Sequence, residues 1–92
     1  MKLPDVVSHL AKLDDELIIF MENLDDSESD VVLLDAGEDG DVVREHKGRT
    51  YEYLIEIIFA KKIVAEWKET LPSEPDVNTI TDHVYRFATK NL

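Results

Sequence analysis

The residues that could do chemistry are mostly carboxylates, and they are concentrated between Leu24 and Asp41. This segment holds eight acidic residues and no basic residue, while its centre is the apolar run Val31–Leu34. Clustered carboxylates can bind a divalent cation, transfer protons, mimic a nucleic acid or attract a basic partner. A solvated hairpin with no ligand is the remaining interpretation.

Calcium binding makes the strictest demand on spacing. An EF-hand loop needs side-chain oxygens at positions 1, 3 and 5, a glycine at 6 and a glutamate at 12. Counting from Asp35 places Asp39 and Gly40 as the pattern requires. Position 3 is Gly37, which has no side-chain oxygen, and position 12 is His46 instead of a bidentate glutamate. We therefore expect no calcium site here.

The sequence contains no other catalytic or metal-binding pattern. His9, His46 and His83 have no histidine partner at the spacing of a helical zinc site. The serines lie in no G-x-S-x-G turn, no phosphate-binding glycine loop is present, and the chain has no cysteine. A pair of carboxylates acting as acid and base needs a fold before it can be assigned. We expect a non-catalytic protein with no metal and no cofactor.

The net charge of −11 lies entirely in the first half of the chain. Residues 1–43 contain thirteen acidic and two basic residues, whereas residues 44–92 contain eight of each. This field repels nucleic acids and anionic membranes and speeds association with a basic protein. We expect a basic protein partner, no nucleic acid and no membrane; the alternative is that the charge only confers solubility. The one basic cluster, Arg44–Arg49, is interpreted as counter-charge to acidic segments of the same or a neighbouring subunit.

The length of 92 residues predicts a single domain, 1–92, with a modest core. Without cysteine the chain forms no disulfides, which fits a reducing compartment. The N-terminal stretch lacks the apolar region of a signal peptide, and the longest apolar run, Leu17–Met21, is far too short to span a bilayer. We therefore expect a cytoplasmic protein.

Apolar spacing predicts the elements that position these residues. Residues with helical spacing follow Pro4 and predict a short helix over about 4–13. The runs Leu17–Met21 and Val31–Leu34 are short and mostly branched, which predicts two strands, and a third short strand is expected near 41–45. Because both strands are continuously apolar, we expect cover on both faces or a second layer from another chain.

The second half predicts two helices. No glycine or proline interrupts residues 50–69, which favours a long central helix that begins at Thr50. Its apolar residues occupy nearly all sides, so it must be covered by the rest of the fold or by another protein. A last helix is expected at about 75–90. The order α-β-β-(β)-α-α predicts an α+β fold, with a small antiparallel sheet of two to three strands packed by three helices.

Three large aromatic residues of the predicted long helix are candidate interface anchors: Tyr53, Phe59 and Trp67. Core packing is the alternative role for Tyr53 and Trp67. If one face of this helix meets a second copy, the protein is a homodimer.

Several segments resemble a group of small acidic bacterial proteins of unknown function. The resemblance rests on Tyr53–Glu56, Ala60–Trp67 and Leu13–Glu16, and it implies a stand-alone bacterial protein without supplying an activity. In size, acidity and lack of motifs the chain is also similar to immunity proteins of bacterial toxin systems. Such a likeness implies binding and inhibition of a cognate toxin, often a basic nuclease.

These observations predict a non-catalytic acidic protein-interaction module, in its most concrete form an immunity-type inhibitor of a basic toxin or nucleic-acid-binding protein. The alternative is a self-associating structural or regulatory protein. The acidic residues expected to steer the partner are Asp25, Asp26, Glu28, Asp30, Glu38, Asp39 and Asp41.

Overall fold

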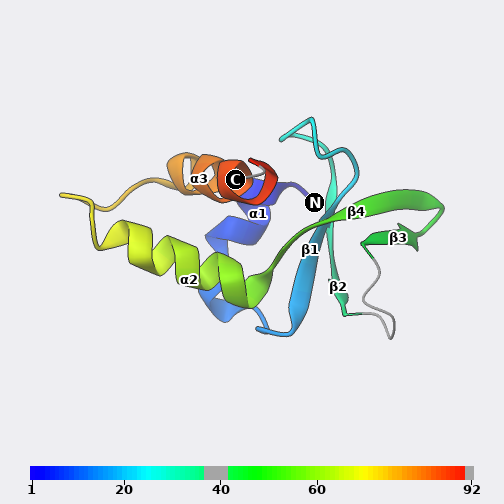
Figure 1. Cartoon of the computed structure of the whole chain (residues 1–92), viewed down its shortest axis with the longest axis horizontal. Coiled ribbons are helices and arrows are strands. Elements are labelled where there is room, and N and C mark those ends of the chain that lie inside the picture. The colour runs from blue at the N-terminus through cyan, green and yellow to red at the C-terminus, as the bar shows by residue number, and fades with distance from the viewer. Residues whose placement is uncertain (37–41, 91–92) are drawn as a thin grey trace.

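A computed structural model describes residues 1–36 and 42–90 and shows an α+β fold (Figure 1). The elements run along the chain as α1 (Leu3–Ser8), the short 3-10 turn η1 (Leu10–Lys12), β1 (Leu17–Met21), β2 (Val31–Asp35), β3 (Val43–His46), β4 (Arg49–Glu56), α2 (Ile57–Lys68) and α3 (Val77–Thr89). The strands form one antiparallel sheet in the order β2-β1-β4-β3. The predicted sheet of two to three strands is therefore wrong, and the predicted element order lacks one strand.

The predicted long helix over 50–69 is also wrong, because its first part is the strand β4. β3 and β4 are joined by a tight turn in which Lys47 has φ 51° and Gly48 has φ 80°. Two consecutive residues with positive φ match the twist of a hairpin, and the register His46↔Arg49 follows from this turn. β4 then enters α2 at Glu56 without a loop, so a strand pattern and a helix pattern follow each other directly.

The central strand pair contains an irregularity that places two apolar residues on the same side. Ile19 pairs with Ile55 while Phe20 pairs with Tyr53, so Leu54 is an extra residue in β4. Leu54 and Ile55 are both buried in the core beneath the helices. Such a bulge bends its strand and increases the local twist.

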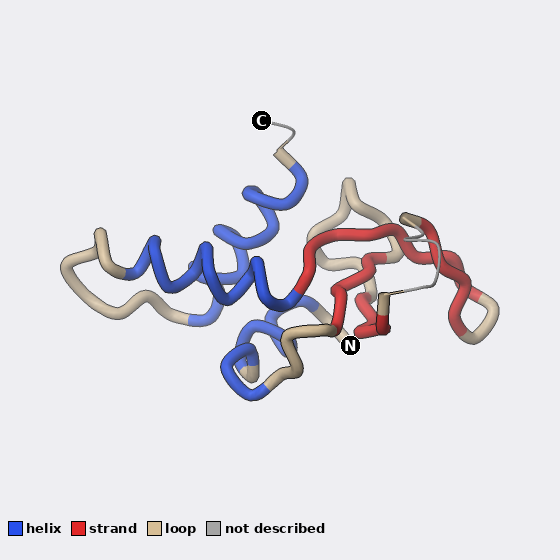
Figure 2. Tube along the Cα trace, turned by 60° about the horizontal axis from the view of Figure 1, so that its bottom comes forward, coloured by secondary structure: helices blue, strands red, loops and turns tan. Residues whose placement is uncertain are grey.

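The three helices pack on one face of the sheet and lie together at one end of the molecule (Figures 1 and 2). The main core forms where they meet the strands, and each helix contributes a fully buried side chain: Leu3 from α1, Ile57 from α2 and Val84 from α3, which meet Ile19 and Met21 of β1. Burial of each such side chain contributes about 1.5–3 kcal/mol to folding. α1 and α3 are far apart in sequence, yet this core brings them side by side.

The helix-free face of the sheet has its own small core. Phe20 is fully buried there, with Ile18 and Tyr51 beside it. The ring of Tyr53 meets that of Phe20 edge-on at 6.1 Å. The guanidinium of Arg44 lies 5.2 Å from the Phe20 ring centre and donates a hydrogen bond to the Asp35 carbonyl. Arg44 thus links the two outer strands, β3 and β2, across the curled face.

Replacing Arg44 with alanine tests this link. We expect Arg44→Ala to lower the free energy of unfolding by about 1–2 kcal/mol, because it removes a cation–π contact and a hydrogen bond. Lys12→Ala, which alters an exposed basic residue of η1, is the control and should change stability by less than about 0.5 kcal/mol. Urea denaturation measures both, and equal effects would show that Arg44 does not hold the sheet closed.

Candidate functional site

The loop that joins β1 to β2, residues 22–30, has a conformation fixed by its own polar side chains. The Asp25 amide donates to Asn23 Oδ1 at 3.0 Å, and the Glu28 amide donates to Asp26 Oδ1 at 2.9 Å. The Ser29 hydroxyl donates to the Asn23 carbonyl at 2.9 Å and accepts from the Asn23 amide at 3.1 Å. Such side-chain turns favour one loop shape before any partner binds. Residues 22–30 are hereafter the acidic loop.

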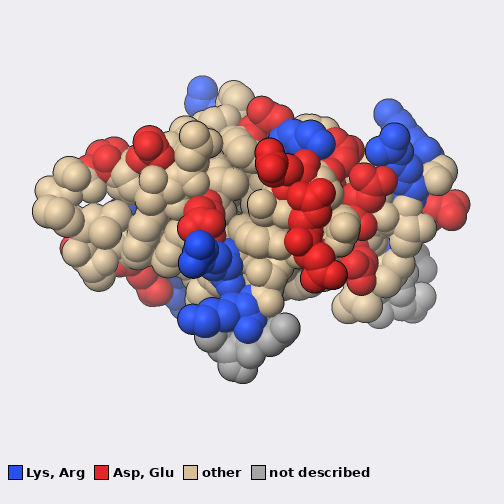
Figure 3. All heavy atoms as spheres, turned by 90° about the horizontal axis from the view of Figure 1, so that it is seen from above, with Lys and Arg blue, Asp and Glu red and all other residues tan. Residues whose placement is uncertain are grey.

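Three of the predicted acidic residues, Asp25, Asp26 and Glu28, are exposed on the acidic loop. Figure 3 shows acidic side chains gathered over this part of the surface. Glu38, Asp39 and Asp41 lie outside the described residues. The other end of β2 is Asp35, and a five-residue strand places it roughly 13 Å from Val31. Asp25, Asp26 and Glu28 therefore lie together at the loop end of the sheet, whereas Asp35 lies at the opposite end of β2.

Asp30, the last residue of the acidic loop, is engaged within the protein. Its carboxylate lies 2.9 Å from the N-terminal ammonium and accepts a hydrogen bond from the Tyr51 hydroxyl at 3.2 Å. The hydrogen bond from the ammonium, with that from Tyr51, holds the pKa of Asp30 below its ordinary value despite some desolvation. The Met1 carbonyl also accepts the Val31 amide at 2.8 Å, so Asp30 lies where the N-terminus is tied to β2.

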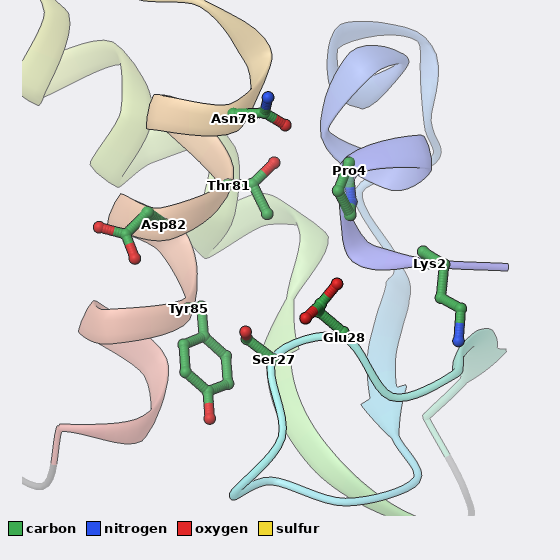
Figure 4. Close-up of a pocket in the computed structure, with 8 residues that line it drawn as sticks. All are labelled: Lys2, Pro4, Ser27, Glu28, Asn78, Thr81, Asp82 and Tyr85. Atoms are coloured by element: carbon green, nitrogen blue, oxygen red, sulfur yellow. The ribbon is translucent and has the colours of Figure 1, made fainter.

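A hollow of about 360 Å³ lies between the acidic loop, α1 and α3 (Figure 4). Its lining residues are Lys2, Pro4, Ser27, Glu28, Asn78, Thr81, Asp82 and Tyr85. In Figure 4 the Glu28 carboxylate points toward the gap from the loop, Thr81 and Asn78 face it from α3, and Asp82 points away. Asp82 instead forms an exposed ion pair with Arg86, at 2.9 Å. Within the described part of the chain Glu28 has no ion-pair partner.

The α3 side of the hollow was not predicted from the sequence. The Tyr85 hydroxyl donates to the Leu24 carbonyl and so fixes the acidic loop against a helix 61 positions away. Asn78, Thr81 and Tyr85 recur at intervals of three and four, which places them on one flank of α3. The helical spacing of these polar residues could have indicated from sequence that this flank of α3 contacts something polar. It does not indicate which loop the flank contacts.

The three predicted anchors do not form one surface. Tyr53 lies on β4 at the helix-free face, where its hydroxyl donates to Glu56 at 3.1 Å. Burial, then this hydrogen bond, raises the pKa of Tyr53 above its ordinary value. Phe59 and Trp67 lie two turns apart on α2, and Phe59 is 50% exposed. Trp67 stacks on His83 of α3, with ring centres 4.0 Å apart and planes 5° from parallel.

The basic cluster supplies counter-charge within the chain. Arg49 pairs with Glu22 at the start of the acidic loop, at 3.4 Å, and Arg44 contacts Phe20 and Asp35 as described above. Among residues 1–36 and 42–90, no three histidine, aspartate or glutamate side chains lie close enough to share a metal ion. Over the same residues, no helix combines the length and apolar character needed to cross a membrane.

Comparison of the chain with protein-family models, with curated proteins and with solved structures finds no match. The resemblance to small acidic bacterial proteins and the likeness to immunity proteins therefore stay predictions. The function has to be argued from the acidic loop, the hollow and the charges around them.

The stack between Trp67 and His83 predicts a pH-dependent signal. Burial lowers the pKa of His83 below its ordinary value, and the nearby Asp82 only partly opposes this. The folded state therefore holds fewer protons than the unfolded state as the pH falls past the ordinary histidine range, and stability decreases there. Trp67 is the single tryptophan, so its fluorescence reports protonation of the stacked imidazole.

We expect the fluorescence of Trp67 to fall with a midpoint below pH 6.5, the ordinary pKa of histidine, because a protonated imidazole quenches indole. His83→Gln should remove this transition, whereas His9→Gln, which alters an exposed histidine of the N-terminal segment, should leave it unchanged. A midpoint at or above the ordinary value would contradict the burial of His83.

Proposed function

We propose that the protein is a non-catalytic interaction module whose acidic loop binds a basic protein. The observation that carries this proposal is the exposure of Asp25, Asp26 and Glu28 on a loop whose shape is already fixed by internal hydrogen bonds. A preorganised loop loses little conformational entropy on binding, so more of the electrostatic attraction is retained as affinity. The excess negative charge of the first half of the chain acts over a longer range and raises the association rate.

The hollow beside the loop gives this proposal a specific contact. A lysine or arginine side chain of the partner would enter next to the Glu28 carboxylate, which has no described ion-pair partner. Asn78 and Thr81 supply oxygen atoms on the opposite wall, and the Tyr85 ring offers an apolar surface for the stem of the side chain. An arginine side chain inserted in a pocket beside the acidic loop would be a typical interaction hot spot.

In its most concrete form the partner is a basic toxin or a basic nucleic-acid-binding protein, and the module acts as an immunity-type inhibitor in the cytoplasm. The acidic field disfavours binding to nucleic acids or anionic lipids themselves, because both carry the same sign of charge. The acidic loop would occupy the partner's own phosphate-binding surface and so block it.

The interaction can be tested with a fluorescein-labelled peptide of nine arginines. We expect the triple variant Asp25→Asn, Asp26→Asn, Glu28→Gln to bind it roughly tenfold more weakly, since three attractions are lost, each worth a few tenths of a kcal/mol or more. The control triple Glu45→Gln, Glu69→Gln, Glu74→Gln removes the same charge from exposed positions outside the loop and should have a smaller effect. Fluorescence anisotropy measures both affinities.

Binding of the peptide to the unmodified protein should also weaken steeply as salt is added. If the two triple variants lose affinity equally, the acidic loop is not a defined site, and only the net charge of the protein attracts the peptide. If binding does not depend on salt, the electrostatic basis of the proposal is wrong. For the inhibitor form, the direct test is whether the protein protects cells from a basic toxin encoded beside its gene.

A further inference from the structure

The flank of α2 that faces α3 carries a partly exposed, mainly aromatic surface that the proposed function does not use. It consists of Phe59, Ile63 and Trp67 at intervals of four on α2, and of His83 and Phe87 at the same interval on α3. The Trp67–His83 stack joins the two helices. Ile63 and Trp67 also pack against the main core, so the middle of this surface is half-buried and its two ends are exposed. Phe59 is 50% exposed and Phe87 is 45% exposed, although each is a large apolar ring. These five residues are hereafter the aromatic face.

The aromatic face and the acidic loop lie on different flanks of α3. Asn78, Thr81 and Tyr85 line the hollow beside the loop. At 100° per residue, His83 and Phe87 lie on the other flank of the helix, toward α2. The aromatic face is therefore turned away from the surface that carries the excess negative charge.

The charges beside the aromatic face are balanced. Lys62 and Glu66 are exposed on α2, one turn apart and opposite in sign, and Lys90 follows Phe87 at the end of α3. Residues 44–92 as a whole have as many basic as acidic residues. A basic partner would be drawn to the acidic loop and not to this face.

We propose that the aromatic face binds the same face of a second copy of this chain. Two chains of charge −11 repel each other, so a homodimer has to form through the part of the surface where the charge is balanced. In a two-fold dimer, Lys62 of one copy would lie near Glu66 of the other, and the same pair would form a second time with the copies exchanged. The apolar rings would be buried between the two copies. The arrangement joins two pairs of helices and leaves both acidic loops facing outward.

The size of the face fits a weak dimer. A specific interface needs about 600 Å² from each partner at the low end, roughly a tenth of the 6058 Å² surface of this chain. α2 is about 18 Å long, and with α3 beside it a face of that order is available. Interfaces at this low end are typical of weak or transient complexes, so we expect a measurable monomer population beside the dimer.

Sedimentation equilibrium at about 10–300 µM protein tests the dimer, since a small interface dissociates within this range. We expect a dimer that becomes tighter when salt rises from about 50 to about 500 mM, because salt screens the repulsion between two acidic chains. This sign is opposite to that expected for binding of a basic partner. If no dimer forms, the proposed function is unaffected. If the arginine peptide does not bind, the proposed dimer is unaffected.

Two substitutions with one matched control locate the surface. Phe59→Asp and Phe87→Asp should each weaken the dimer at least tenfold, because a carboxylate would be buried between apolar rings. Ile58→Asp is the control: Ile58 has the same exposure of 50%, but its side chain is turned by about 100° to another side of α2. Circular dichroism and thermal unfolding check that each variant is folded.

Trp67 provides a second readout, because its indole signal in a proton–nitrogen NMR spectrum should shift with protein concentration. The proposal is overturned if the unmodified protein is a monomer at the highest concentration in both salts. It is also overturned if Ile58→Asp disrupts the dimer as strongly as Phe59→Asp.

Discussion

The fold depends on burying β1 on both faces, although helices cover only one. Ile19 and Met21 face the helices, whereas Ile18 and Phe20 face the other way and need a cover of their own. Water is excluded because the sheet curls, which the extra residue in β4 assists, and because Arg44 closes the open side. At the loop end of the sheet, the Tyr85 hydroxyl of α3 donates to the Leu24 carbonyl and fixes the acidic loop against this helix.

Part of the acidic composition is structural. Asp5 accepts the Lys2 amide, Asp14 accepts the Glu16 amide, and Asp76 accepts the Thr79 amide at the start of α3. Backbone hydrogen bonding by Thr79 lowers the pKa of Asp76. These carboxylates stabilise turns and helix starts by satisfying backbone donors that have no other partner. The total charge therefore overstates the number of acids that are free to meet a partner.

The sequence predicts the elements well where one period holds throughout a segment. β1 occupies 17–21 and α3 lies within 75–90, because each has a clear apolar pattern bounded by polar residues. The prediction fails at 50–69, where Thr50, Tyr51 and Tyr53 favour a strand but run without a break into the helix. Because the strand pattern and the helix pattern were treated as one helix, the predicted helix was apolar on every side. The loop acids are recognisable from sequence, whereas their pairing with the α3 flank is a tertiary contact that no local pattern encodes.

The central claim is that the acidic loop and the hollow beside it form one binding surface for basic side chains. Titration of the arginine peptide into ¹⁵N-labelled protein tests this directly. The account predicts that the largest amide shifts occur in the acidic loop and on the flank of α3 that carries Asn78, Thr81 and Tyr85. Shifts spread evenly over all exposed acids, or concentrated on β3 and the end of α2, would contradict it.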